Sequence, residues 1–217
     1  MSNKLTLIVT SILILAALGV GLVLYAQLPD PMPSHWNAAG EVDGYMSRFW
    51  GVFLMPLVTV GLTLLLFAVP YLDPLKANIA KFRGLYNAFI VGFVAYMLYV
   101  YGLTLAASLG YRFNMTLMLL PVMGLLFIGI GYLLKSAKRN FFIGIRTPWT
   151  LSSDTVWEKT HQLGAKLFIA SGLLIVVSAF LGERGIWLML AVLMIALFVP
   201  IVYSYILFAR EEREANK

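Results

Sequence analysis

The chain has 217 residues, of which 61% are hydrophobic and 12% are charged, with no cysteine and a formal net charge of +6. A typical soluble domain is about 45–50% apolar and 25% charged, so the composition excludes a soluble globular protein and leaves no room for a large soluble catalytic domain. The lack of cysteine excludes disulfides, thiolate nucleophiles and cysteine-ligated metal sites, and we assign the positive charge to membrane orientation rather than to direct contact with nucleic acid.

Six apolar runs come close to or exceed the length of about 20 residues that a helix needs to cross a bilayer. They cover residues 5–27, 49–72, 85–109, 115–134, 164–181 and 186–208. The first run is longer than the apolar part of a signal peptide and lacks a good cleavage site at Leu24-Tyr25-Ala26, so we expect it to remain as a helix. The predicted fold class is all-α: a polytopic membrane protein with six transmembrane helices.

The basic residues are distributed unevenly between the two ends of these helices. Of the 16 Lys and Arg residues, only Arg48, Arg112 and Arg184 fall on one side, and all the others fall on the side that also holds both termini. Because cytoplasmic loops carry the excess of Lys and Arg, we expect the N- and C-termini in the cytoplasm.

Two connections are long enough to carry polar chemistry, and we name them the outer loop (28–48) and the inner loop (135–163). We divide the chain into an N-terminal four-helix half, 1–134, with the extracytoplasmic outer loop, and a C-terminal half, 135–217, with the cytoplasmic inner loop and two helices. Together they are expected to form one membrane domain.

A transporter reading has little support in the apolar runs. None holds an ionisable side chain near its middle, where ion-coupled transporters usually place one. Pro56, Pro121 and Pro200 interrupt the second, fourth and sixth runs and can kink them, and such broken helices are the only transporter-like feature.

The outer loop contains the turn formers Asn37, Gly40, Asp43 and Gly44 and is expected to be compact. Its candidate binding residues are Asp30, His35, Trp36, Asn37, Asp43 and Tyr45. Three interpretations stay open. His35, Glu41 and Asp43 converge on a metal or form an acid/base pair; the polar side chains cap turns while the aromatic rings lie at the membrane interface; or the loop recognises an extracellular ligand. We predict no metal, because a zinc site needs three or four ligands with second-shell support and this loop has one imidazole.

The inner loop changes along its length from basic to aromatic to hydroxyl-rich. Lys135, Lys138 and Arg139 suit an anionic lipid surface. Ser152 or Ser153 is expected to cap a helix with Asp154 in its first turn. The side chains of Trp157, Thr160, His161, Gly164 and Phe168 then lie on one stripe of this interfacial helix, which leads into the fifth run.

The candidate binding residues of the inner loop are Arg146, Thr147, Trp149, Ser152, Trp157, Glu158 and His161. A Ser153–Asp154–His161 triad is excluded, because residues eight apart on a helix are separated by about 12 Å. Glu158 and His161 can meet on one helix face, as a structural pair or as an acid/base pair. Arg146 lies between Gly144 and Pro148, where it either binds a carboxylate, a phosphate or helix carbonyls or ties the loop to the bundle. No catalytic residue and no cofactor is predicted.

Two stretches resemble the SdpI-like family of immunity proteins against the sporulation-delaying peptide toxin. The first runs from Leu28-Pro29 through Pro33, His35-Trp36-Asn37 and Gly40 to Asp43 and Tyr45, and it is similar to the family's N-terminal domain of unknown function. The second, residues 144–152 with Trp157 and His161, is similar to the C-terminal signature. Trp36 and Tyr45 stand where Phe and Trp are more usual, which leaves an aromatic ring at both positions.

The resemblance implies a multi-pass protein of the bacterial cell membrane that protects its host from a secreted, membrane-active peptide toxin. It also implies a signalling role in some operons, in which such a protein holds a cytosolic repressor at the membrane. The expected partners are the peptide toxin, a repressor and membrane lipids. The alternatives are a membrane-embedded enzyme that uses His35 with Asp43 or His161 with Glu158, or a small-molecule transporter.

Overall fold

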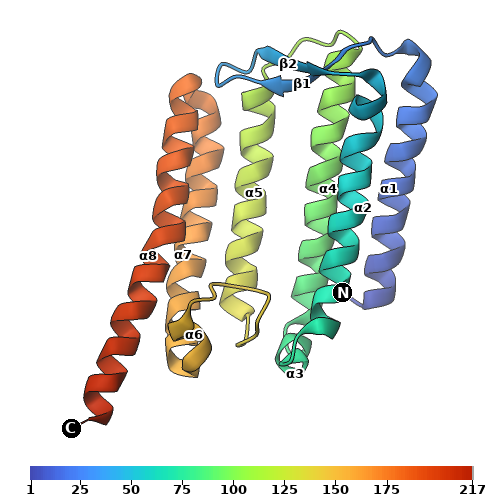
Figure 1. The fold of residues 1–217 in the computed structure, drawn as a ribbon. Helices are drawn as coiled ribbons and strands as arrows, with labels where there is room; N and C mark the ends of the chain where they lie inside the picture. Colours follow the sequence, from blue (N-terminus) through green and yellow to red (C-terminus); the bar gives the residue numbers. More distant parts are fainter. Residues whose placement is uncertain (217) are drawn as a thin grey trace.

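The computed structural model describes residues 1–216 and is dominated by long, roughly parallel helices (Figure 1). In chain order the elements are α1 (Asn3–Leu24), the 3-10 turn η1 (Tyr25–Gln27), strands β1 (Met32–Trp36) and β2 (Val42–Met46), α2 (Arg48–Leu72), α3 (Lys76–Ala80), α4 (Arg83–Ser108), α5 (Met115–Ser136), α6 (Pro148–Ser152), α7 (Asp154–Ser178), the 3-10 turn η2 (Ala179–Leu181) and α8 (Glu183–Ala215).

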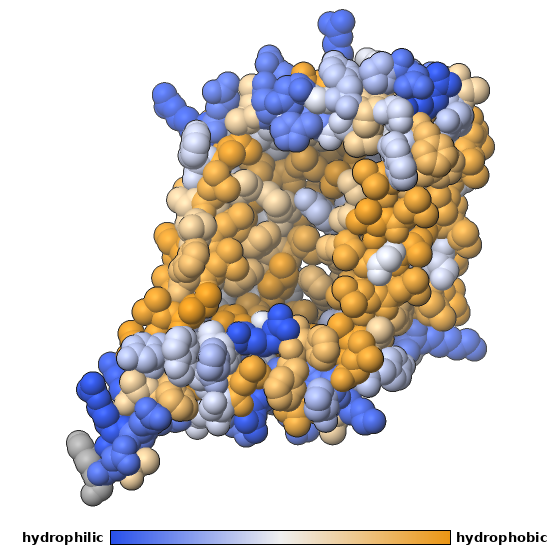
Figure 2. Space-filling view, in the orientation of Figure 1, coloured by the Kyte–Doolittle hydropathy of each residue, from blue (hydrophilic) through white to orange (hydrophobic). Residues whose placement is uncertain are grey.

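Six helices in the described part of the chain are long and apolar enough to cross a membrane: α1, α2, α4, α5, α7 and α8. Figure 2 shows apolar side chains forming a belt between two polar ends. A hydrocarbon core is about 30 Å thick, so helices of this length span it with some tilt. The predicted all-α polytopic fold is confirmed, with one short β-hairpin in the outer loop added to it.

Helix α7 begins at Asp154, well before the apolar run that starts at residue 164. The Ser153 hydroxyl accepts a hydrogen bond from the backbone N–H of Val156, and Asp154 lies in the first turn, so the predicted capping is confirmed at Ser153. The predicted interfacial helix and the fifth span are therefore one continuous helix. Its predicted stripe, Trp157, Thr160, His161, Gly164 and Phe168, is buried throughout.

Proline does not end any of the spanning helices. Pro56 and Pro70 lie inside α2, Pro121 inside α5 and Pro200 inside α8, and each helix continues on both sides. Pro56, Pro70 and Pro200 are themselves buried between helices. Membrane helices tolerate proline in this way, because neighbouring groups satisfy the freed backbone carbonyl.

The spanning helices pack as two groups, α1 with α2 and α4, and α5 with α7 and α8, joined mainly where α4 meets α5. The division expected from the sequence lies at residue 134, just before the long inner loop begins. The packing instead places α5 with α7 and α8. Figure 1 shows the two groups side by side, with the hairpin across one end and α3 and α6 at the other.

Small residues set the close approach of α5 and α7. A Cβ atom on Gly124 would lie 2.5 Å from the Gly172 carbonyl oxygen, and one on Gly172 would lie 2.5 Å from the Gly124 oxygen. About two turns further along, a Cβ on Gly131 would lie 2.9 Å from the Ala165 oxygen. In lipid, where no hydrophobic effect drives helices together, such backbone contact is a main source of association.

Candidate functional site

The outer loop folds into an antiparallel β-hairpin across the end of the bundle (Figure 1). Asn37 makes its turn: its backbone N–H donates to the Glu41 carbonyl, and its side-chain oxygen accepts from the Glu41 N–H. Gly40 completes the turn with φ +82°, a conformation that favours glycine. The prediction of a compact loop is confirmed, but Asp43 and Gly44 lie in strand β2 rather than in a turn.

Both ends of the hairpin are fastened to helices of different groups. At its base, the Asp30 carboxylate accepts a hydrogen bond from the backbone N–H of Arg48, at the start of α2. At its tip, the Asn114 amide donates to the Ala39 carbonyl, and the Thr116 hydroxyl donates to the Ala38 carbonyl, both at the start of α5. The hairpin therefore bridges the two helix groups.

His35 and Asp43 meet across the hairpin, with 2.5 Å between Nδ1 and Oδ1, and both side chains are largely exposed. Glu41 does not join them, because its carboxylate accepts from the Asn37 amide instead. The three-residue convergence considered for this loop is thus wrong. Among residues 1–216, no group of three His, Asp or Glu side chains could hold a metal ion.

The aromatic candidates of the outer loop lie on its strands. Trp36 is half-buried at the end of β1, opposite Val42. Tyr45 is 61% exposed on β2 and pairs with Pro33. Tyr45 and the His35–Asp43 pair form the exposed face of the hairpin, whereas the half-buried Trp36 does not belong to it.

The inner loop starts with a tight turn built on Asn140, whose side chain is fully buried. The Asn140 amide oxygen accepts from the backbone N–H groups of Phe142 and Ile143, and its nitrogen donates to the carbonyls of Lys138 and Ile143. Every polar atom of the side chain is thereby bonded within the loop. This turn is a structural feature that the sequence reasoning missed.

A buried carboxylate ties the same turn to the end of α2. Asp73 is 2% exposed; one of its oxygens accepts from the Leu75 N–H and the other from the Phe141 N–H. The Asn78 amide, in α3, donates to the Arg139 carbonyl. Asp73 was not a candidate either, although an acid directly after an apolar run is the signal that points to such a role.

Gly144 carries the chain closely over the ring of His161. It has φ +118°, and a Cβ atom at this position would overlap His161 Nε2. That nitrogen accepts a hydrogen bond from the Ile145 N–H at 3.0 Å, while Nδ1 lies 2.8 Å from the Trp157 carbonyl. Because one nitrogen accepts and the other donates, the ring is neutral, and both of its polar atoms are used.

Trp157 completes this buried cluster. Its ring stacks on His161 with 3.9 Å between centroids, and its Nε1 donates to the Ala137 carbonyl. Glu158 instead is exposed and accepts from the Gln162 amide. The Glu158–His161 pair considered from the sequence is therefore wrong, because His161 turns inward to the loop backbone.

Residues Pro148–Ser152 form the one-turn helix α6, and Thr147 is its N-cap. Thr147 and Thr150 cap it reciprocally as a capping box, with Pro148 in the first turn. The Thr147 and Ser204 hydroxyl oxygens are 3.0 Å apart, which joins α6 to α8 in the buried interior. Ser152 is exposed and donates to the Pro148 carbonyl.

Arg146 and Trp149 lie on the more open side of the inner loop. Arg146 is exposed, and its Nη1 donates to the Phe141 carbonyl at 2.7 Å. This contact closes the loop on itself and leaves the rest of the guanidinium available. Trp149 is half-buried and packs against Tyr205 of α8, with 5.1 Å between ring centroids.

Beside Arg146 and Gly144, the inner loop borders an apolar cavity of about 450 Å³ between the two helix groups. Figure 2 shows this face of the molecule hollowed between its two sides, with apolar walls. The helix side chains that line it come from five spanning helices: Leu66, Val69, Tyr86, Phe89, Ile130, Leu133, Leu134, Phe168, Ala196, Leu197 and Ile201.

The candidate residues thus form two separate groups at opposite ends of the bundle (Figure 1). In the inner group, Thr147, Trp157 and His161 use their polar atoms to hold the loop, and Arg146 lines the cavity. In the outer group, only the hairpin face is open. This arrangement suits binding of an apolar or amphipathic molecule.

Comparison with known proteins agrees with the two motifs. Residues 136–204, which include the inner loop motif, match the model of the SdpI/YfhL protein family. Residues 12–60, which include the outer loop, match the model of a domain of unknown function, DUF1648.

A curated relative, the immunity protein SdpI of Bacillus subtilis (strain 168), is 29% identical over 200 residues, which cover 91% of this chain and 93% of the relative. No solved structure matches the chain at a significant level. The likeness thus extends over both loops and the helices between them, and this multi-pass membrane protein is similar to the SdpI/YfhL family over its C-terminal third and to DUF1648 over its N-terminal part.

Proposed function

We propose that this protein protects the bacterial membrane that holds it against a secreted, membrane-active peptide toxin. One observation carries the proposal: the likeness to a protein named as an immunity protein covers about nine-tenths of both chains. The matched ranges, residues 12–60 and 136–204, include both loops.

The cavity beside the inner loop supports this function. A toxin that acts on membranes has apolar segments and reaches its target within the bilayer. Such a segment matches the apolar walls of the cavity, and the Arg146 guanidinium at its edge offers hydrogen bonds to backbone carbonyls or a carboxylate. We propose that the cavity holds part of the toxin and keeps it from assembling elsewhere.

The hairpin face supplies the first contact in this proposal. The distribution of Lys and Arg favours cytoplasmic termini, which puts the hairpin on the outside, where a secreted peptide arrives. His35, Asp43 and Tyr45 offer a polar pair and an aromatic ring on this exposed face. Aromatic side chains provide much contact area at a low cost in conformational entropy.

The same topology leaves the inner loop facing the cytosol, and we propose that any cytosolic repressor docks there. Ser152 and Glu158 are exposed on this side, and neither holds the loop together through a long-range contact. The enzyme alternative loses its inner pair, because both ring nitrogens of His161 bond to backbone groups and Glu158 bonds to Gln162 instead.

The proposal is tested by survival of toxin-sensitive bacteria challenged with the purified sporulation-delaying peptide. Cells that express the protein should survive, and cells that express Arg146→Ala at equal membrane abundance should lose much of the protection. Lys159→Ala is the matched control, because it removes an exposed charge of the same loop, and the Lys159 side chain forms no hydrogen bond or ion pair in residues 1–216. Equal killing with and without the intact protein would contradict the function.

A further inference from the structure

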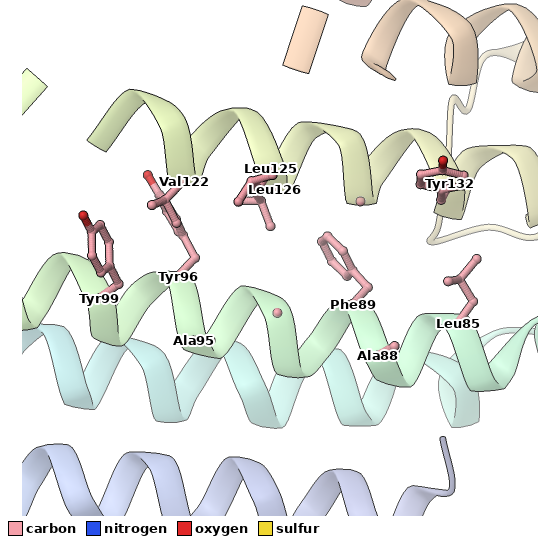
Figure 3. Close-up of a pocket in the computed structure, with 12 residues that line it drawn as sticks. Leu85, Ala88, Phe89, Ala95, Tyr96, Tyr99, Val122, Leu125, Leu126 and Tyr132 are labelled. Atoms are coloured by element: carbon pink, nitrogen blue, oxygen red, sulfur yellow. The ribbon is translucent and has the colours of Figure 1, made fainter. Parts of the chain in front are cut away.

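A second apolar groove lies between α4 and α5, with a volume of about 540 Å³. Figure 3 shows its side chains: Tyr96, Tyr99 and Phe89 from α4, and Leu125, Leu126 and Tyr132 from α5. Small residues on both helices form its floor, which leaves the space between the rings open. The groove therefore lies where the two helix groups are joined.

The groove is long enough for an acyl chain. On α4 its lining extends from Leu85 to Tyr99, which is about 21 Å of helix. One lipid tail spans about half of the 30 Å hydrocarbon core. A fatty chain can therefore lie along the groove within one leaflet.

A polar pocket of about 280 Å³ lies at one end of these two helices. It is lined by Lys81, at the end of α3, and by Lys135 and Lys138, around the end of α5. Lys135 follows Tyr132 by about one helical turn, and Lys81 precedes Leu85 by four residues, so these lysines lie near the end of the groove that Leu85 and Tyr132 line.

The pocket retains positive charge after its internal pairing. Arg139 is neutralised by Asp154, with 2.7 Å between Nε and Oδ1. Lys81 donates only to the neutral amide of Asn78, and in residues 1–216 neither Lys135 nor Lys138 forms an ion pair. One further acid, Glu158, borders the pocket, so the lysines outnumber it.

We propose that the groove and the pocket together form a binding site for one anionic phospholipid. The acyl chain lies between α4 and α5, and the phosphate lies among Lys81, Lys135 and Lys138. A zwitterionic lipid has the same tail but gains less from the lysines. The bound lipid would fill the seam between the two helix groups, and this role is independent of any toxin.

The chain offers closely matched variants to test this site. Gly92 and Gly129 line the groove, and a Cβ at either position meets no atom within 4 Å, so leucine fits there and fills the groove. Gly102 lies on α4 outside the groove and is equally free of neighbours. Gly102→Leu is thus the control for Gly92→Leu with Gly129→Leu.

Native mass spectrometry of the full-length protein, with equimolar phosphatidylglycerol and phosphatidylcholine of identical chains, measures the bound lipid. We expect a phosphatidylglycerol adduct that Lys135→Gln and Lys138→Gln each weaken about fivefold. The groove-filling double variant should lose the adduct, and Gly102→Leu should keep it. Far-UV circular dichroism checks that each variant is folded.

Several outcomes would overturn the proposal. Equal binding of the two lipids would remove the role of the lysines, and an unchanged adduct in the groove-filling variant would show attraction to the surface alone. Loss of the adduct in Gly102→Leu would show that the effect is not specific to the groove. If soluble glycerol phosphate competes with phosphatidylglycerol as strongly as a second phospholipid does, the pocket binds a free anion. If an acidic peptide displaces the lipid and still binds the groove-filling variant, the pocket binds a protein instead.

Discussion

Substitution of Gly144 by alanine tests whether the inner loop is held over His161 by the absence of a side chain. Gly144 has φ +118°, and its Cβ would overlap His161 Nε2, the atom that accepts from the Ile145 N–H. A non-glycine residue in such a backbone region costs about 1–3 kcal/mol. Displacing the ring also leaves a buried backbone donor unpaired, at a further cost of about 1–3 kcal/mol.

The expected destabilisation is therefore about 2–6 kcal/mol, concentrated in the loop. Hydrogen–deuterium exchange of peptides covering residues 138–152 measures local opening, and thermal unfolding in detergent measures the whole protein. Gly110→Ala is the control, because Gly110 has φ +90° but open space around its Cβ position. Gly144→Ala should increase exchange in residues 138–152 more than Gly110→Ala increases exchange in its own turn. Equal increases would show that packing against His161 does not hold the inner loop, and the reasoning would be wrong.

Three further substitutions give separate expectations. Asp73→Ala removes a buried carboxylate that accepts two backbone hydrogen bonds and should cost about 3 kcal/mol, seen as faster exchange in the inner loop; unchanged exchange would contradict this tie. Gly172→Ala forces a methyl group against the α5 backbone and should lower unfolding stability by about 1–3 kcal/mol, whereas Gly61→Ala, with open space, should not lower it. For protection from the toxin, His35→Ala should matter more than Glu41→Ala, because His35 is on the hairpin face and Glu41 only serves the turn; the reverse order in a survival assay would refute this.

The spanning helices could be predicted from the sequence because the signal is local. A run of about 20 apolar residues must satisfy its backbone within itself in lipid, and a helix is the simplest way to do so. Capping by Ser153 and the buried stripe of α7 follow from residue type and spacing alone. The ends of α7 and α8 extend beyond the apolar runs, because polar residues also continue a helix once it has begun.

The loops depend on partners that are distant in sequence, and here the prediction fell short. Phe141 is held by Asp73, 68 residues away, and Thr147 meets Ser204, 57 residues away. No local pattern shows these pairs. The outer loop has a clear turn signal at Asn37, but the pairing of its strands requires knowledge of the register. From the sequence, the His35–Asp43 pair was therefore expected only as one of several arrangements.

The grouping of the helices was also beyond the sequence. The loops of the chain place α5 with the first three spans, whereas close backbone contact through Gly124 and Gly172 places it with α7. Several other glycines in the helices have open space around them, such as Gly61 and Gly102. Glycine in a membrane helix therefore marks a contact only when its neighbours are known.

The central claim is tested most directly by the membrane potential of toxin-sensitive bacteria challenged with the purified sporulation-delaying peptide, with and without this protein. The account predicts that the potential persists in cells that contain the intact protein and collapses in cells that lack it. Collapse in both, with the protein correctly inserted and abundant, would contradict the claim that it protects the membrane against this toxin.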